Sequence, residues 1–217
     1  MPQFHHACAI NVLNTCSGYV IMVTDDKITE RNKTVAYLQS KVTCREIVSP
    51  PGIVDEAATR EKYRQLTLRL IEDGRTITTM ESCTSGQVAS LITDTEGASA
   101  VMPGAFVTYS NAAKVRMGVP AETIETFGVY SAQTASAMAR ACRENLGTDI
   151  GVGVTGTFGN VDPNNADSAP GEVYFAIDAA DETTVWHCAV PAQPSRLAYK
   201  LYMADVIADR VLALYDK

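Results

Sequence analysis

The chain has 217 residues, of which 46% are hydrophobic and 20% charged, as in an ordinary globular protein. Its net charge of −7 would repel a nucleic-acid backbone, and the sequence has no basic stripe with interleaved aromatic residues, which excludes nucleic acid as a partner. No apolar run is long enough to span a bilayer, and residues 1–15 lack the charged start and apolar core of a signal peptide. We therefore expect a cytoplasmic protein without a membrane partner.

Six cysteines are scattered along the chain without a CxxC motif or any other metal-ligand spacing, so we expect free thiols. The three histidines are His5, His6 and His187. Two of them lie near a terminus and one lies in a predicted strand, which supplies neither a zinc site nor a Ser-His-Asp triad. The sequence thus predicts no metal and no cofactor.

Residues 1–50 differ in pattern from the rest of the chain. Residues 19–23 are a candidate strand and residues 29–40 a candidate short helix, and the Pro-Pro-Gly run at 50–52 breaks the chain. This stretch is either an added edge of the sheet or a mobile arm. We divide the chain into an N-terminal extension of unknown role, residues 1–52, and one domain over residues 53–217.

From residue 55 onward, helical and strand patterns alternate. Helices are predicted at 55–73, 85–93, 111–117, 131–146 and 195–215, with Gly74 and Gly147 as stops after the first and the fourth. Strands are predicted at 76–80, 105–109 and 149–154, followed by a hairpin at 172–177 and 184–190, while Pro120 and Gly128 mark turns. This order predicts an α/β fold, a three-layer α/β/α sandwich with a mixed sheet, plus the N-terminal extension.

The most informative stretch is 76–86, Thr-Ile-Thr-Thr-Met-Glu-Ser-Cys-Thr-Ser-Gly. It predicts a short strand that turns abruptly into a helix, with Ser82 at the turn. Such a corner exposes a side chain at the edge of the sheet and directs free backbone N–H groups at whatever lies in front of it. A serine placed there can attack a carbonyl while those N–H groups stabilise the oxyanion. Taken alone, the same residues are more often simple helix caps.

A second strand-to-helix corner follows at 107–114, Val-Thr-Tyr-Ser-Asn-Ala-Ala-Lys, with Tyr109 and Lys114 on either side of it. Taken alone, it fits a capped helix with a packed tyrosine and a solvated lysine. In a third stretch, 151–159, glycines alternate with apolar residues, which permits close approach by a ligand or by another backbone. The loop that follows offers hydroxyls and N–H groups to an anion or a sugar. Neither a dinucleotide-binding nor an NTPase glycine motif is present.

Residues 81–86, Glu-Ser-Cys-Thr-Ser-Gly, resemble the E-S-C-T-G-G signature of the CinA C-terminal domain family, which comprises nicotinamide-nucleotide amidohydrolases. Residues 107–114 match the family's V-T-Y-S-N-x-x-K motif, and Tyr109 follows Ser82 by 27 residues, as in the family. Residues 169–174 are similar to its P-V-G-T-V-[WY] strand start, and Arg196 resembles an arginine at the start of its last helix. The resemblance covers residues 57–217.

The chain departs from the family pattern in two places. Ser85 stands where the family has its first glycine after the threonine, which crowds the start of the helix. The family's [ST]-G-I-A-G-P-x-G loop reads Thr-Gly-Thr-Phe-Gly-Asn-Val-Asp-Pro at 155–163, with Gly156 and Gly159 kept in altered surroundings. If this loop contacts the nucleotide, the departure affects the identity of the substrate rather than the chemistry.

The resemblance implies hydrolysis of the carboxamide of nicotinamide mononucleotide to nicotinate mononucleotide and ammonia. Ser82 would form an acyl-enzyme, and Lys114 would be the general base if burial lowers its pKa. Tyr109 would relay the proton or hold the amide, and whether Lys114 or Tyr109 is the base stays open. The oxyanion would bind the backbone N–H groups of Thr84, Ser85 and Gly86. The phosphate would meet Arg196 or residues of the loop after the third strand, namely Thr155, Gly156, Thr157, Gly159 and Asn160.

Cys83 is a rival nucleophile, but consecutive side chains at a tight corner point in different directions, and no histidine is placed to activate a thiol. Two other functions stay open. One is a catalytically silent homologue that binds a nucleotide or a partner, and the other is an amidase for another small amide, reshaped by Phe158 and Asn160. The expected partners are a small-molecule nucleotide substrate and, from the resemblance, further copies of the chain in a homo-oligomer.

Overall fold

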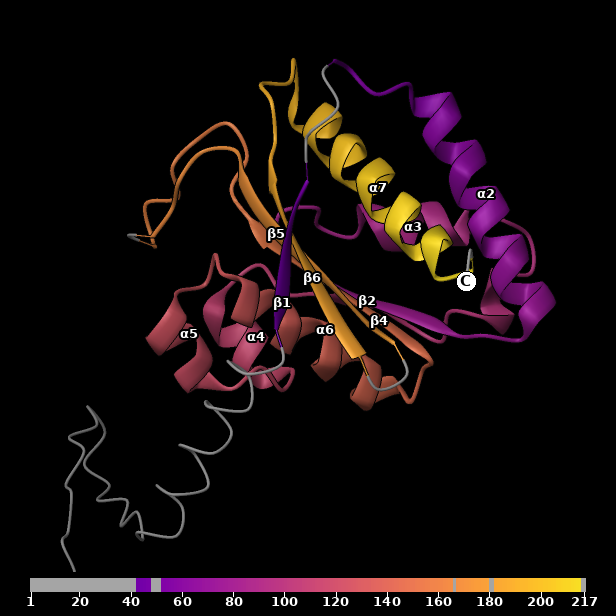
Figure 1. Cartoon of the computed structure of the whole chain (residues 1–217), viewed down its shortest axis with the longest axis horizontal. Coiled ribbons are helices and arrows are strands. Elements are labelled where there is room, and N and C mark those ends of the chain that lie inside the picture. The colour runs from indigo at the N-terminus through magenta and orange to yellow at the C-terminus, as the bar shows by residue number, and fades with distance from the viewer. Residues whose placement is uncertain (1–41, 48–51, 166, 180–181, 216–217) are drawn as a thin grey trace, which may run out of the picture. The chain divides into compact units, whose positions relative to one another are not determined.

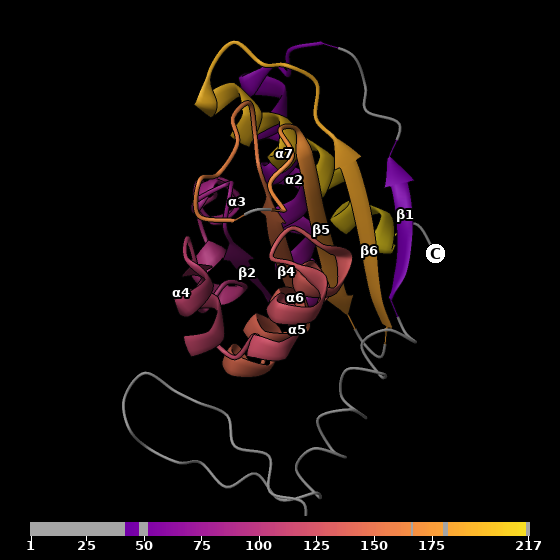
Figure 2. The same cartoon turned by 90° about the vertical axis from the view of Figure 1, so that its left-hand side faces the viewer.

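The computed structural model of the protein describes residues 42–47, 52–165, 167–179 and 182–215, all within one compact unit. Its centre is a six-stranded sheet with the order β1-β6-β5-β4-β2-β3 (Figure 1, Figure 2). β2 runs parallel to β3 and β4, β5 runs antiparallel to β4 and β6, and β1 runs parallel to β6. The strands are β1 (Thr43–Ile47), β2 (Ile77–Glu81), β3 (Phe106–Val107), β4 (Ile150–Gly156), β5 (Glu172–Ala179) and β6 (Glu182–Ala189).

Helices cover both faces of this sheet (Figure 1). One face carries α2 (Glu56–Asp73), α3 (Gln87–Thr93) and α7 (Arg196–Leu212), and the other carries α4 (Asn111–Arg116), α5 (Ala121–Phe127) and α6 (Ala132–Leu146). Short 3₁₀ helices form at η1 (Ala98–Ala100) and η2 (Ala213–Tyr215). The three-layer sandwich with a mixed sheet, predicted from the alternation of helices and strands, is confirmed.

Side chains at the helix ends explain where most helices begin and stop. Asp55 accepts hydrogen bonds from two amides in the first turn of α2, and Gly74, with φ 62°, ends the helix in the left-handed conformation. Ser131 and Ser195 cap α6 and α7 in the same way, each accepting from the amide three residues later. These caps are local signals, so the predicted helix boundaries lie within a few residues of the observed ones.

Two elements differ from the prediction. The strand predicted at 105–109 pairs with β2 only at Phe106 and Val107, because β3 is an edge strand whose Val107 side chain is 55% exposed. The stretch between Pro120 and Gly128, for which no helix was predicted, forms helix α5. Since α5 has only seven residues, it is shorter than the window over which an apolar period identifies a helix.

β1 lies within the stretch assigned to the N-terminal extension. It pairs with β6 and forms one edge of the sheet, which is one of the two alternatives left open for that stretch. His187 of β6 links the outer strands, since its Nδ1 lies 2.7 Å from Glu46 Oε2 in β1 and its Nε2 contacts Glu172 of β5. The strand predicted at 19–23 and the helix predicted at 29–40 lie outside the described residues.

The glycines of β4 allow α6 to lie close to the sheet. A Cβ atom at Gly151 would overlap with the carbonyl oxygen of Ala139, and one at Gly153 with that of Ala135. The alternating glycines therefore serve the approach of another backbone, one of the two possibilities predicted for them. Because β2 and β4 are parallel neighbours, their carboxyl ends lie at the same edge of the sheet. The two loops that leave these strands thus form one site.

Candidate active site

Ser82 lies in the turn between the end of β2 and the start of α3. Its amide donates to the carbonyl of Val154 in β4 at 3.0 Å, which fixes the turn to the neighbouring strand. The Ser82 side chain is 6% exposed and lines a cavity at the edge of the sheet. The strand-to-helix corner predicted from the sequence is therefore present, with the serine hydroxyl at its tip.

Two consecutive residues with positive φ turn the chain into α3, namely Ser85 at 51° and Gly86 at 87°. A residue with a Cβ atom is strained in this left-handed region by about 1–2 kcal/mol, and glycine is not. The E-S-C-T-G-G pattern places glycine at both positions. This chain therefore carries backbone strain, at Ser85, three residues from the candidate nucleophile.

We expect Ser85→Gly to raise the free energy of unfolding by about 0.5–1 kcal/mol, because the relief of strain exceeds the entropy that glycine adds to the unfolded chain. Urea denaturation measures the change. Ser90→Gly is the matched control, since Ser90 is exposed inside α3 and glycine there should lower stability. Equal losses of stability in the two variants would contradict the strain at Ser85.

Glu81, the last residue of β2, is fully buried and caps the turn that carries Ser82. Its Oε2 accepts from the amides of Gly86 at 2.8 Å and Val88 at 3.2 Å. Its Oε1 accepts from the amide of Ala89 at 2.9 Å and from the hydroxyl of Thr79 at 3.0 Å. The carboxylate thus pairs backbone donors that would otherwise be orphaned at the start of α3. The sequence reasoning gave Glu81 no role, although it is the first residue of the matched signature.

Lys114 enters the site from α4 with only 1% of its surface exposed. Its Nζ lies 3.0 Å from Ser82 Oγ and donates to the carbonyl oxygen of Thr108 at 2.8 Å. Ser110 caps α4 and so sets where that helix, and with it Lys114, begins. The structure therefore brings together the hydroxyl and the amine of two corners that are 32 residues apart.

The surroundings change the acidity of both Lys114 and Cys83. Burial lowers the pKa of Lys114 to about 8, although the nearby Cys83 and Asp162 act in the opposite direction. A neutral amine at this position can accept a proton from Ser82 while it donates to the Thr108 carbonyl. Burial, reinforced by Glu81, raises the pKa of the Cys83 thiol to about 12, so this thiol stays protonated. Both shifts favour Ser82 over Cys83 as the nucleophile.

Tyr109 and Arg196 meet at the cavity from the β3–α4 connection and the start of α7. Arg196 Nη2 donates to Tyr109 Oη at 2.8 Å, and Nη1 donates to Asn160 Oδ1 at 3.2 Å. The guanidinium also lies over the ring of Phe158, 5.4 Å from its centroid. Because the Tyr109 oxygen accepts from Arg196, its own proton remains for a ligand.

The cavity beside Ser82 has a volume of about 160 Å³. Of the residues predicted for the site, it brings together Ser82, Tyr109, Gly156, Thr157, Asn160 and Arg196, with Lys114 directly behind Ser82. Thr155 and Gly159 do not line it. The Thr155 hydroxyl donates to the Val129 carbonyl at 2.9 Å, and Gly159 packs against Tyr199.

Two of the three backbone amides predicted as oxyanion donors, those of Ser85 and Gly86, have other partners in the structure. The amide of Gly86 donates to Glu81, and the amide of Ser85 donates to the Ser82 carbonyl at 3.1 Å. An oxyanion would therefore reach the amides of Ser85 and Gly86 only by displacing these bonds, whereas the Tyr109 hydroxyl at the cavity keeps a proton to donate.

Tyr130 and Asp162 line the same cavity and were not among the predicted site residues. The Tyr130 hydroxyl donates to Asp162 Oδ2 at 2.6 Å. Asp162 occupies the position of the last glycine in the family's [ST]-G-I-A-G-P-x-G pattern. This departure was the one signal in the sequence that pointed to Asp162. Tyr130 carries no such signal, because it comes from the turn between α5 and α6.

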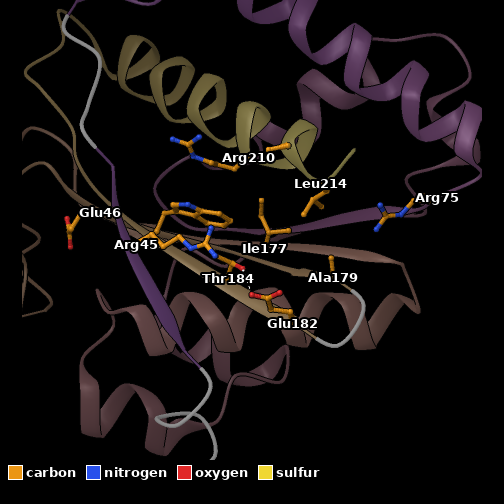
Figure 3. A pocket seen from close by; sticks show the side chains of 11 residues that line it. Arg45, Glu46, Arg75, Ile177, Ala179, Glu182, Thr184, Arg210 and Leu214 are labelled. Carbon is orange, nitrogen blue, oxygen red and sulfur yellow. Dashed lines mark hydrogen bonds between the residues drawn. The ribbon is translucent and has the colours of Figure 1, made fainter. Parts of the chain in front are cut away.

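A larger hollow of about 630 Å³ lies at the other end of the sheet, where Arg45, Arg75 and Arg210 stand around it (Figure 3). Ala179 at this hollow pairs with the first residue of β4, whereas Gly156, at the smaller cavity, is the last residue of β4. The described residues around the hollow include no hydroxyl or thiol beside an amine or an imidazole. The arrangement suited to catalysis is therefore at the smaller cavity.

Within the described ranges, no group of three or more His, Cys, Asp or Glu side chains is arranged to hold a metal ion. None of the helices in those ranges is both long and apolar enough to cross a bilayer.

The protein is thus a mixed-sheet α/β sandwich that carries a buried Ser–Lys pair beside the ends of two parallel strands. Comparison with protein families identifies it further: the model of the CinA C-terminal domain matches residues 59–204. The chain belongs to the CinA family, which confirms the resemblance seen in its motifs.

Similar proteins agree with this assignment. The chain is 34% identical over 165 residues to a CinA-like protein of Geotalea daltonii, with 76% of this chain and 38% of the relative covered. It is 44% identical over 114 residues to a CinA-like protein of Citrifermentans bemidjiense, with 52% and 27% covered. The chain thus spans only about a third of the length of these curated relatives.

Solved structures of similar proteins share the fold. The competence/damage inducible protein CihA from Agrobacterium tumefaciens has a TM-score of 0.67 and 30% identity, with 76% of this chain and 97% of that chain covered. A competence or damage-inducible protein from Enterobacter asburiae has a TM-score of 0.66 and 25% identity, with 72% and 97% covered.

Proposed function

We propose that the chain hydrolyses the carboxamide of nicotinamide mononucleotide to nicotinate mononucleotide and ammonia through an acyl-enzyme on Ser82. The observation that carries the proposal is the 3.0 Å separation between Ser82 Oγ and Lys114 Nζ in a buried site. The two family motifs that contain these residues support the class of substrate. A homo-oligomer acting in the cytoplasm is part of this proposal.

In the first half of the reaction, the neutral amine of Lys114 takes the proton of Ser82 while Oγ attacks the carboxamide carbon. The carbonyl oxygen becomes an oxyanion, to which the Tyr109 hydroxyl donates a hydrogen bond; a donor of this kind contributes about 3–4 kcal/mol to the transition state. The tetrahedral intermediate collapses when the C–N bond breaks. The proton held by Lys114 passes to the departing nitrogen, which leaves as ammonia.

In the second half, Lys114 takes a proton from a water molecule, which attacks the acyl carbon and releases Ser82 Oγ. The proton returns to Ser82, and the product leaves with a carboxylate in place of the amide. Arg196 is held at the cavity by Tyr109 and Asn160, and its guanidinium is the group placed to receive the phosphate.

A second candidate, an amidase for another small amide, is favoured by one observation. The cavity is small, about 160 Å³, and is partly lined by the loop that departs from the family pattern, among other positions, at Phe158 and Asn160. The same Ser82–Lys114 chemistry would then act on a different amide. A panel of small carboxamides assayed beside nicotinamide mononucleotide separates the two.

The test is to incubate the purified protein with nicotinamide mononucleotide and to measure ammonia and nicotinate mononucleotide. We expect both products in equal amounts, no turnover in Ser82→Ala, and turnover retained in Cys83→Ala, since the thiol is protonated. Activity that survives in Ser82→Ala would end the serine mechanism. Tight nucleotide binding without ammonia from the unaltered protein would favour the silent homologue.

A further inference from the structure

The loop after β4 is pinned to the α6 side of the site. The Asn111 amide group of α4 donates to Asn165 Oδ1 at 2.8 Å, and the backbone amide of Tyr130 donates to Asp167 Oδ2 at 3.1 Å. Within the loop, the Asp162 amide donates to the Ser168 hydroxyl at 2.7 Å. The loop is thus attached both to the helix that carries Lys114 and to the turn before α6.

Asp162 is the centre of this attachment and is one of the residues that line the cavity. Oδ2 accepts from the Tyr130 hydroxyl at 2.6 Å and from Asn165 Nδ2 at 2.6 Å. Oδ1 accepts from the amide of Asn164 at 2.9 Å and from its side chain at 3.2 Å. The bond from Tyr130 and those from Asn164 and Asn165 lower the pKa of Asp162 to about 2, so the group is negatively charged at neutral pH.

The opposite charge enters the cavity from the other face of the sheet. Arg196 stands at the start of α7, whereas Tyr130, which holds Asp162, precedes α6 on the opposite face (Figure 1). Among the described residues, neither Asp162 nor Arg196 forms a salt bridge with another side chain. In the described part of the chain, the partners of Arg196 are the neutral side chains of Tyr109, Asn160 and Phe158. The cavity therefore has a negative side and a positive side.

We propose that Asp162 makes this cavity selective for carboxamides whose ring carries a positive charge, with Arg196 receiving an anionic group on the opposite side. The attraction is coulombic rather than a direct hydrogen bond, because four donors already occupy the Asp162 oxygens. This inference rests on the proposed function, since the pyridine ring of nicotinamide mononucleotide is a cation while free nicotinamide is neutral. Because Asp162 replaces a glycine of the family pattern, the selectivity is a property of this chain.

The test compares two probes that present the same carboxamide with and without the ring charge, 1-methylnicotinamide and nicotinamide. Each is titrated by calorimetry into Ser82→Ala, which binds without turnover. We expect the cation to bind about ten-fold more tightly. In Ser82→Ala/Asp162→Asn the two probes should bind within about two-fold of each other, because asparagine keeps the shape and removes the charge.

Asp167→Asn, also in the Ser82→Ala background, is the matched control. Asp167 is acidic and holds the same turn, but it is exposed and does not line the cavity. It should keep the ten-fold preference. Equal affinities in Ser82→Ala, an equal loss of preference in both aspartate variants, or binding of neither probe would overturn the inference. These measurements need no catalysis, so a protein that prefers the cation but releases no ammonia would contradict the proposed function and leave the role of Asp162 standing.

Discussion

Lys114→Met is expected to lower kcat for nicotinamide mononucleotide by about 10²–10⁴-fold, the range that removal of a general base produces. Methionine fills most of the space of the buried lysine side chain but has no group that accepts a proton. KM should change little, because Lys114 contacts Ser82 and the Thr108 carbonyl rather than the open part of the cavity. Ammonia release under saturating substrate measures the loss.

The pH profile tests the same assignment in the unaltered protein. Only the neutral amine can act as the base, and the pKa of Lys114 is lowered to about 8. We therefore expect kcat/KM to rise with pH up to about 8 and to level off above it. Tyr109→Phe should keep this rise while lowering the rate, since the phenol donates to the oxyanion. A profile that is flat from pH 6.5 to 9.5, or a rise that disappears in Tyr109→Phe, would mean that a group other than Lys114 is the general base.

Stability provides a control on the lysine variant. The pKa of Lys114 is about 8 in the folded protein and near the ordinary lysine value of 10.5 in the unfolded chain, so the unfolded chain binds more protons between these values. The stability of the unaltered protein relative to Lys114→Met should then rise across this window, by at most about 3 kcal/mol. Urea unfolding at pH 7 and pH 10 measures the difference. Unfolding of Lys114→Met at pH 7 would remove the variant as a test of catalysis and leave the pH profile as the test.

Much of the site could be predicted from the sequence because its residues lie at short strand-to-helix turns. Ser82 and Lys114 each lie at a strand-to-helix turn with its own capping residues, and the parallel strands β2 and β3 bring these turns to one edge of the sheet. The fold could be predicted because helical and strand patterns alternate along the sequence. Helix α5 was missed because its seven residues are fewer than the window over which an apolar period identifies a helix.

The parts of the site that could not be predicted depend on contacts between residues far apart in the sequence. Arg196 and Tyr109 are 87 residues apart, and their hydrogen bond depends on how α7 crosses the sheet. The Tyr130–Asp162 pair depends on a loop whose path no periodicity describes. The alternating glycines of β4 suggested either a ligand or a backbone, and only the packing of α6 distinguishes the two.

Glu81→Ala is expected to lower the free energy of unfolding by about 4 kcal/mol. The substitution removes the acceptor for the amides of Gly86, Val88 and Ala89 and leaves these donors buried beside a small void, and each unpaired donor costs about 1–3 kcal/mol. Glu81→Gln keeps the volume and one oxygen but directs an NH₂ group at one of the remaining donors. Its expected loss of unfolding free energy is about 2 kcal/mol, half of that expected for Glu81→Ala.

Urea denaturation with Glu96→Gln as the control separates this effect from a change in net charge, because Glu96 is exposed beyond the end of α3 and its substitution should change stability by less than about 0.5 kcal/mol. If the turn is held by the carboxylate, kcat should fall in Glu81→Gln even where the protein remains folded, since the capped amides and Ser82 belong to one turn. A Glu81→Ala variant as stable as Glu96→Gln would mean that the start of α3 is held by the packing of Val88 and Leu91, and that Glu81 does not position the nucleophile.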